Sequence, residues 1–144
     1  MKKILSQSTG AIVLSPKLNK ILIVYQAQQG YWVFPKGKIE SQETEIDTLT
    51  RELKEEIGLT KFSILPNFRE TIYFDFQLNE QIIVHREITY YLVRAQTMDV
   101  TLDQKESSEH CWCDFQEVMR YLKYPNQQKL VRKVRVYLKE YHHV

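Results

Sequence analysis

Residues 44–57 carry the pattern that most restricts the fold, because their apolar side chains recur at the period of an α-helix. The apolar positions are Ile46, Leu49, Leu53 and Ile57. Thr44 and Asp47 have the spacing of an N-terminal capping box, and Gly58 is a typical C-terminal cap. A helix with one apolar face must bury that face against another element, so the pattern predicts a layered fold.

Short runs rich in β-branched and aromatic residues surround this helix and predict β-strands. The expected strands cover residues 11–14, 20–25, 31–34, 68–77, 81–94 and a short segment around Trp112. Turn residues at 15–19 predict a hairpin between the first two strands. After the third strand the backbone must turn at Pro35–Gly37.

Two more helices are expected in the last third of the chain. Asp114 and Glu117 have capping spacing for a short helix that stops before Pro125. Pro125 suits the first turn of a last helix. We expect the inward face of that helix to hold Leu130, Val134, Leu138 and Tyr141. Strands, a helix, strands and then helices indicate a mixed α/β domain.

The composition fits a single domain over residues 1–144 with one hydrophobic core. Apolar residues make up 43% and charged residues 26%, which excludes a disordered chain. The net charge of +2 argues against a polycation that binds nucleic acid nonspecifically. Cys111 and Cys113 are too few for a disulfide framework or a zinc site, so we expect reduced cysteines in or near the core.

The sequence contains no apolar run of the ~20 residues that a membrane-spanning helix needs. The basic start at Met1–Gln7 has an apolar stretch of only two residues, so we expect no targeting segment. These features predict a cytoplasmic monomer that does not associate with membranes. At the end of the chain, His142 and His143 are expected to be disordered.

Three carboxylates crowd one side of the expected helix. At about 100° per residue, Glu52 and Glu56 lie together on one flank of the apolar stripe, and Glu55 lies farther round on the same side. Like charges this close weaken a helix by about a few tenths of a kcal/mol per pair unless a cation lies between them. Oxygen ligands select a hard cation such as Mg²⁺, which also recruits phosphate oxygens.

An ordinary solvated acidic face would carry the same residues, and Lys54 could pair with part of the cluster. Glu45 falls on the same sector of the helix as Glu52, but it lies roughly 10 Å away along the axis. We therefore expect Glu45 to be a first-turn charge that favours the helix dipole rather than a cation ligand.

The stretch from Gly37 to Leu59 resembles the Nudix box, whose glycine, glutamate and Arg-Glu-aliphatic-x-Glu-Glu-x-Gly-aliphatic segment have fixed spacing. The matching positions are Gly37, Glu43, Arg51, Glu52, Leu53, Glu55, Glu56, Gly58 and Leu59. The resemblance implies the Nudix fold, an α/β/α sandwich around a mixed β-sheet in which the catalytic helix follows a strand and a loop. It also implies Mg²⁺-dependent hydrolysis, with Mn²⁺ as an alternative ion, of a nucleoside diphosphate linked to another group.

The same resemblance assigns roles within the box. It makes Glu52, Glu55 and Glu56 the metal-binding and water-activating carboxylates, and it gives the carbonyl of Gly37 to the metal. We expect Glu43 and Arg51 to be mainly structural, since Glu43 falls on the opposite flank of the helical wheel from Glu52.

Residues outside the box resemble asymmetrical diadenosine tetraphosphate hydrolases. Trp32–Lys38 is similar to their Trp-x-x-Pro-Lys-Gly stretch, which implies that Lys36 contacts phosphate. Arg86 stands on a strand where that family usually has a phosphate-binding Lys, and it keeps the charge. Glu106, in the loop before the last strand, has the spacing of a glutamate that helps to hold metal or to activate water.

Three tyrosines extend this resemblance. Tyr124 stands where the family stacks an aromatic ring on adenine. Tyr31 stands where many members have His, and its ring could also stack on the base. Tyr73 stands where the family often carries a Tyr near the substrate. An ordinary surface or core role is the alternative for each tyrosine, as it is for Glu106 beside Lys105.

Together the resemblances predict a nucleotide substrate, diadenosine tetraphosphate, and its hydrolysis to ATP and AMP. Glu52, Glu56 and Glu106 would hold Mg²⁺, and either Glu55 or Glu106 would take a proton from the attacking water. Other Nudix substrates, such as 5′-triphosphate RNA or a damaged nucleoside triphosphate, remain alternatives, as does a non-catalytic nucleotide sensor. Basic residues on the last helix favour RNA, although a solvated helix face explains them as well.

Overall fold

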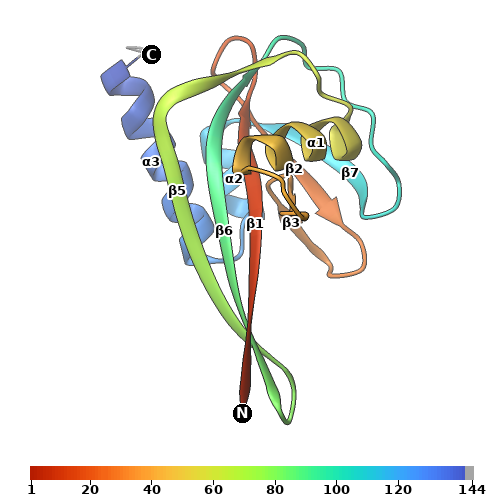
Figure 1. Cartoon of the computed structure of the whole chain (residues 1–144). Helices are drawn as coiled ribbons and strands as arrows, with labels where there is room; N and C mark the ends of the chain where they lie inside the picture. The colour runs from red at the N-terminus through yellow and green to blue at the C-terminus, as the bar shows by residue number, and fades with distance from the viewer. Residues whose placement is uncertain (142–144) are drawn as a thin grey trace.

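A mixed β-sheet with helices on both faces forms the molecule in a computed structural model that describes residues 1–141 (Figure 1). His142 and His143 therefore lie outside the described residues. The elements are β1 (Lys2–Leu14), β2 (Ile21–Gln26), β3 (Tyr31–Val33), β4 (Lys36–Lys38), α1 (Glu45–Ile57), β5 (Phe62–Asn79), β6 (Ile82–Ala95), β7 (Ser107–Cys113), α2 (Phe115–Tyr121) and α3 (Pro125–Tyr141).

The strands follow the order β3-β2-β1-β6-β5, with β4 also paired to β1 and β7 to β2. β1 and β6 run parallel, and the remaining strand pairs are antiparallel. The predicted hairpin is confirmed by the pairing of Val13 with Leu22. The expectation of a mixed sheet is therefore correct.

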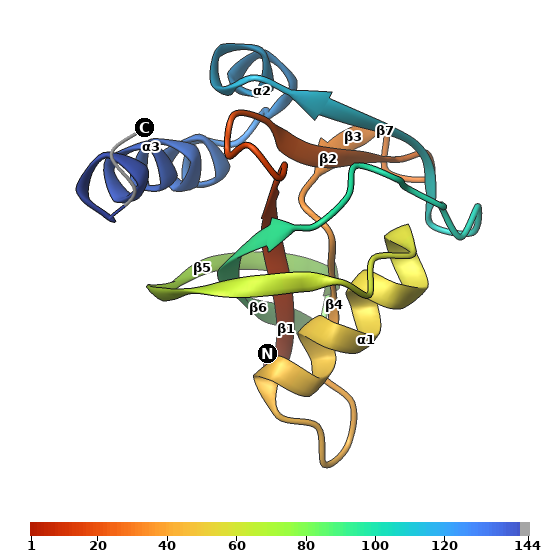
Figure 2. The ribbon, with the colours of Figure 1, turned by 90° about the horizontal axis from the view of Figure 1, so that it is seen from above.

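The two faces of the sheet bury separate apolar clusters, because successive side chains of a strand point in opposite directions. Ala11 and Val13 of β1 pack in the cluster covered by α1, whereas Ile12 and Leu14 pack in the cluster covered by α2 and α3 (Figure 2). This arrangement confirms the α/β/α sandwich.

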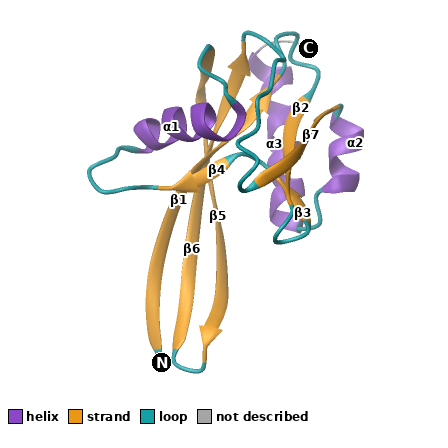
Figure 3. Cartoon of the chain, turned by 90° about the vertical axis from the view of Figure 1, so that its right-hand side faces the viewer, coloured by secondary structure: helices purple, strands orange, loops and turns teal. Residues whose placement is uncertain are grey.

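Two strands are longer than their apolar runs indicate. β1 begins at Lys2 rather than at 11, and β5 begins at Phe62 rather than at 68. Both strands pair with β6. The backbone hydrogen bonds of this pairing keep the additional residues in strand conformation, although few of their side chains are buried. The outer ends of β1, β5 and β6 project beyond the helices as a three-stranded arm (Figure 3).

α1 has the predicted extent and caps. The Thr44 hydroxyl accepts a hydrogen bond from the backbone N–H of Asp47, and the Asp47 carboxylate accepts one from the N–H of Thr44. Gly58 ends the helix with a φ of 69°, a conformation that favours glycine. The prediction that Ile46 and Tyr141 face inward is wrong: they are 40% and 52% exposed, because each lies in the end turn of its helix.

Glu45 does more than favour the helix dipole, which corrects the sequence-based interpretation. Its carboxylate accepts two hydrogen bonds from Arg69 of β5, at 2.9 and 2.7 Å, and one from the Tyr91 hydroxyl of β6 at 2.5 Å. These contacts fasten the first turn of α1 to the sheet.

The two cysteines lie on β7 beside the cluster covered by α2 and α3. Cys113 is buried, Cys111 is half-buried, and both thiols are free, as predicted. In the described part of the chain, no helix is long and apolar enough to cross a membrane.

Candidate active site

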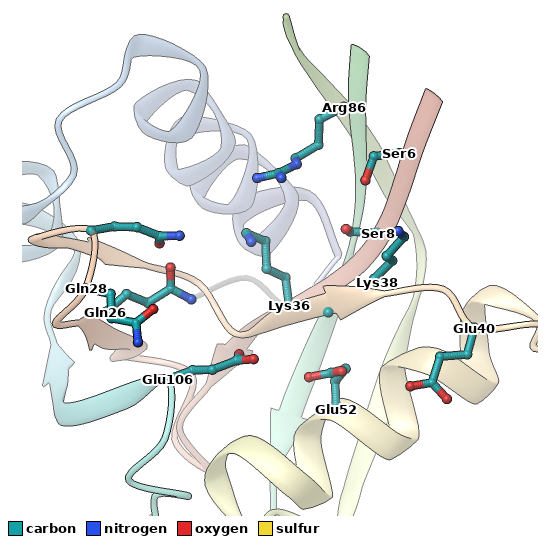
Figure 4. Close-up of a pocket in the computed structure, with 12 residues that line it drawn as sticks. Ser6, Ser8, Gln26, Gln28, Lys36, Lys38, Glu40, Glu52, Arg86 and Glu106 are labelled. Carbon is teal, nitrogen blue, oxygen red and sulfur yellow. The ribbon is translucent and has the colours of Figure 1, made fainter. Parts of the chain in front are cut away.

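A cavity of about 420 Å³ opens beside β4 and α1 (Figure 4). Its lining residues are Ser6, Ser8, Gln26, Gln28, Gln29, Lys36, Gly37, Lys38, Glu40, Glu52, Arg86 and Glu106. The carboxylates of Glu52 and Glu106 lie on one side of Lys36, and the guanidinium of Arg86 lies on the other (Figure 4). A cavity with both signs of charge suits a ligand that carries phosphate together with a metal cation.

The short strand β4 brings the backbone against the acidic helix. The sequence predicted only a turn there, but β4 pairs antiparallel with β1. A Cβ on Gly37 would overlap the carboxylate of Glu52, so this close approach requires glycine. Gly10 of β1 meets the same requirement, since its Cβ would lie 2.8 Å from the carbonyl oxygen of Pro35.

Glu52 is half-buried at the wall of the cavity. Its Oε1 accepts a hydrogen bond from Nη1 of Arg51 at 2.7 Å. Burial raises the pKa of this carboxyl, and the neighbouring Arg51 partly opposes that rise. The carboxylate therefore lies at a place where a further positive charge would stabilise its ionised form.

Glu56 lies one turn farther along α1 and is only 1% exposed. Its Oε1 accepts a hydrogen bond from the Ser107 hydroxyl at 3.0 Å, and its Oε2 has no hydrogen-bond partner among the described residues. Burial raises its pKa to about 7; the bond from Ser107 opposes the rise, and the charge of Glu52 adds to it. A buried carboxylate with one free oxygen needs either a proton or a cation.

The remaining two predicted carboxylates differ in position. Glu106 lines the cavity from the loop before β7, where the Asp103 carboxylate accepts hydrogen bonds from the backbone N–H groups of Lys105, Glu106 and Ser107. The Glu55 side chain is 60% exposed, lies 3.3 Å from Nη1 of Arg51, and does not line the cavity.

The oxygen donors of the cavity fit a hard cation whose coordination shell is completed by water and substrate. Among residues 1–141, no three His, Cys, Asp or Glu side chains stand together as a ready-made metal site. The carboxylate of Glu52 nevertheless lies against the backbone of Gly37 at the cavity wall, and Glu56, one turn farther along α1, keeps an oxygen without a partner among the described residues although it does not itself line the cavity. Mg²⁺ commonly takes one or two carboxylates and fills its other positions with water and phosphate oxygens.

Cationic side chains form the other part of the cavity. Burial lowers the pKa of Lys36, as does the nearby charge of Arg86, while Glu56, Glu106 and Glu52 oppose the change. Arg86 stacks its guanidinium 5.1 Å from the ring centre of Phe76, and its Nε is buried without a partner in the described residues. Both cations would gain from an anionic ligand.

An aromatic cluster joins β3, β5 and the segment just before α3. The rings of Tyr31 and Tyr124 meet edge to face with centres 5.8 Å apart, and Phe74 meets Tyr124 in the same way at 6.2 Å. Tyr31 of β3 pairs directly with Gln26 of β2, and Gln26 lines the cavity. The cluster therefore lies near the cavity and offers apolar ring faces to a base.

A model described as the NUDIX domain matches residues 5–134 of this chain. The chain belongs to the Nudix family. Its cavity is therefore the candidate active site of a Nudix hydrolase, with α1 as the helix of the Nudix box.

The individual proteins that match this chain over most of its length share less than a third of its residues. RNA pyrophosphohydrolase from Helicobacter pylori (strain P12) is 28% identical over 143 residues, which cover 92% of each chain. The m7GpppN-mRNA hydrolase of Saccharomyces cerevisiae is 47% identical over 49 residues, but these make up 34% of this chain and 5% of that protein. The solved structure of a Caenorhabditis elegans Ap4A hydrolase binary complex has a TM-score of 0.84 at 21% identity and covers 94% of this chain and 99% of that one. At such identity the structural likeness concerns the fold.

Within the Nudix box, Arg51 and Glu43 join the loop to the helix. Nε and Nη2 of Arg51 donate to the two oxygens of Glu43 at 2.7 and 2.9 Å, and Nη2 also donates to the carbonyl of Lys38 at 3.0 Å. The hydrogen bonds from Arg51 lower the pKa of Glu43 to about 2. These contacts agree with the structural role expected for both residues.

The structure does not bring Tyr73 to the cavity. Tyr73 pairs opposite Glu87, whereas Phe74 pairs opposite Arg86, so the two side chains point to opposite faces of the sheet. Tyr73 instead stacks on His85, with ring centres 5.8 Å apart. Phe74 takes the place expected for Tyr73, because a shift of one residue along a strand reverses the face.

Sequence reasoning missed several polar lining residues. Ser6 and Ser8 enter the cavity wall because β1 runs parallel to β6, which places Ser6 opposite Arg86. Gln26 and Gln28 come from the end of β2 and the turn that follows it. No local sequence signal marks these positions, since they depend on which strands become neighbours.

Proposed function

We propose that this Nudix hydrolase cleaves dinucleoside polyphosphates and converts diadenosine tetraphosphate to ATP and AMP. The observation that carries the proposal is that three features lie close together at one cavity. They are an acidic wall, a cationic wall and an aromatic cluster. The acidic wall contains Glu52 and Glu106, and the cationic wall contains Lys36 and Arg86. A nucleotide with a long phosphate chain has groups for all three features.

In this proposal Glu52, Glu56 and the carbonyl of Gly37 hold Mg²⁺, for which Mn²⁺ can substitute, and Glu106 is left free to act as a base. When bound, the metal supplies positive charge to the reacting phosphate and makes water a stronger nucleophile. The buried second oxygen of Glu56 supports this role, because no described residue gives it a hydrogen bond, and burial also raises the pKa of this carboxyl.

The side chains divide the remaining work. Glu106 is the preferred general base because it lines the cavity, whereas Glu55 is exposed and paired with Arg51. Lys36 and Arg86 offset negative charge that develops on the phosphate chain. Tyr31, Phe74 and Tyr124 hold one adenine by ring contact.

The test is a comparison of kcat/KM among substrates at a fixed Mg²⁺ concentration. Diadenosine tetraphosphate should give a higher value than ATP or a 5′-triphosphate RNA. A preference for ATP would contradict the proposal, because ATP lacks the second nucleoside. No hydrolysis of any of the three would favour a nucleotide sensor.

A second candidate is removal of pyrophosphate from 5′-triphosphate RNA. The observation in its favour is the match to proteins named RNA pyrophosphohydrolase over 92% of this chain. The same acidic and cationic walls would serve that reaction, since both reactions cleave a phosphoanhydride. A higher kcat/KM for the RNA than for diadenosine tetraphosphate would favour this candidate.

A further inference from the structure

A groove runs between β5 and α3, outside the candidate active site. Two adjoining hollows of about 240 and 490 Å³ form it, and they share Glu70, Lys129 and Lys133. The first hollow also contains Tyr73 and Asn126, and the second extends to Arg132 and Tyr141, among others.

Positive charge gathers on the helix side of this groove. Arg132 and Lys133 follow Lys129 by three and four residues on α3, so both lie on the side of the helix that carries Lys129. Lys133 is paired with Glu70 at 2.9 Å, and Glu140 adds an acidic group at the far end. Among the described residues, Lys129 and Arg132 have no ion-pair partner, so two cations are available to a polyanion.

An exposed aromatic ring stands at the far end of the same groove. Tyr141 lines the second hollow and is 52% exposed, whereas the ring of Tyr73 points to the other face of β5 and stacks on His85. Cations beside an aromatic ring suit single-stranded nucleic acid, because phosphates meet the cations and bases stack on the ring.

The groove begins where the aromatic cluster of the active site ends. Phe74 of that cluster points to the same face of β5 as Ile72, which lines the first hollow, and Tyr124 lies two residues before Asn126 at the start of α3. A strand with its 5′ end in the catalytic cavity and its first base on Tyr124 would thus continue into the groove.

We propose that the groove between β5 and α3 binds single-stranded RNA whose 5′-triphosphate occupies the catalytic cavity. The inference rests on the second candidate function, and it adds the surface that would distinguish an RNA from a mononucleotide. Lys129 and Arg132 contact the phosphates that follow the first nucleotide.

Charge reversal on α3 tests this role. The variants are Lys129→Glu combined with Arg132→Glu, and Arg135→Glu as the matched control. Arg135 is exposed on the same helix, but its guanidinium lies 5.8 Å from the ring centre of Phe115 of α2 and it does not line the groove. All replaced side chains are exposed, so thermal melting should confirm that each variant folds.

The readout is fluorescence anisotropy with a labelled eight-nucleotide 5′-triphosphate RNA in excess chelator, which separates binding from cleavage. The double variant should bind about tenfold or more weakly, and its slope of log affinity against log salt should fall by about 1.4 for the two lost contacts. The control should bind like the parent protein. Equal affinity in the double variant and the control, or no binding by the parent protein, would overturn the proposal.

A parallel assay separates this inference from the main proposed function. Hydrolysis of diadenosine tetraphosphate should be unchanged in the double variant, because that substrate has no phosphates beyond its second nucleoside. If the parent protein fails to hydrolyse it but binds RNA through the groove, the proposed dinucleotide activity fails while the groove assignment stands.

Discussion

At the scale of single residues, Glu56 shows what a helical wheel can and cannot reveal. The spacing of Glu52 and Glu56 placed them on one flank of the apolar stripe, and the structure agrees. Burial was not predictable, because it depends on Ser107 and the loop before β7, which close over Glu56 from a distant part of the chain. The raised pKa follows from that closure rather than from spacing along the helix.

Replacement of Glu56 by Gln should remove a pH-dependent cost of folding. Its pKa rises from 4.5 to about 7 on folding, so the folded protein prefers the protonated form. Its contribution to stability therefore falls as the pH rises from about 4.5 to about 7. In metal-free protein, Glu56→Gln should raise the melting temperature at pH 8 and change it little at pH 4.5, while turnover with Mg²⁺ falls by about a hundredfold or more.

Glu55→Gln is the matched control for this experiment. Glu55 is exposed, so its replacement should change the melting temperature at pH 8 by less than Glu56→Gln does. The same pH dependence in Glu56→Gln and the parent protein would contradict the burial argument.

Arg86 and Tyr124 should affect different kinetic constants. A charge-assisted phosphate contact contributes about 1.5–3 kcal/mol, so Arg86→Ala should lower turnover on diadenosine tetraphosphate by roughly ten- to hundredfold. Tyr124→Ala should mainly raise KM, because stacking binds the ground state and the transition state alike. Steady-state kinetics of both variants provide the measurement. If Arg86→Ala raises KM but leaves kcat unchanged, Arg86 does not stabilise the transition state.

At the scale of elements, local patterns predicted α1 well and the strands less well. The caps and the apolar period of α1 lie within the element itself, so the sequence contains its bounds. The first half of β1 has few apolar residues and is a strand because β6 pairs with it. The same non-local pairing decides that Phe74, and not Tyr73, faces the aromatic cluster.

The attachment of α1 to the sheet gives a prediction at this scale. Glu45→Gln should weaken the contacts to Arg69 and Tyr91, and we expect the free energy of unfolding to fall by about 0.5–1 kcal/mol because Arg69 is exposed and Glu45 only partly buried. Chemical denaturation at low and high salt provides the measurement, and the difference should shrink at high salt. Glu80→Gln, in the turn of the arm, is the control. Equal stability of the two variants would show that the Glu45 contacts do not fasten the helix.

At the scale of the whole molecule, the fold and the chemistry depend on different residues. The apolar clusters on the two faces of the sheet form the core, while the acidic and cationic walls line a cavity at its edge. The family, and hence the sandwich, could be inferred from the box between Gly37 and Leu59. The full lining of the cavity could not, because it gathers residues from β1, β2, β4, α1, β6 and three connecting segments.

Removal of divalent metal should therefore abolish activity and leave the fold intact. Circular dichroism in excess chelator should match that of the protein with Mg²⁺, and activity should return when Mg²⁺ or Mn²⁺ is added back. Bound metal should also raise the melting temperature, because it binds only the folded protein. Full activity in excess chelator would contradict the metal-dependent mechanism.

The most direct test of the proposed function is product analysis of diadenosine tetraphosphate hydrolysis in ¹⁸O-labelled water. The account predicts ATP and AMP in equal amounts, with the label in one of the two. Label in AMP would mean that water attacks the phosphorus next to a nucleoside, and label in ATP would mean attack on the other side of the same bridge. Two molecules of ADP would mean symmetrical cleavage and would contradict the proposed function.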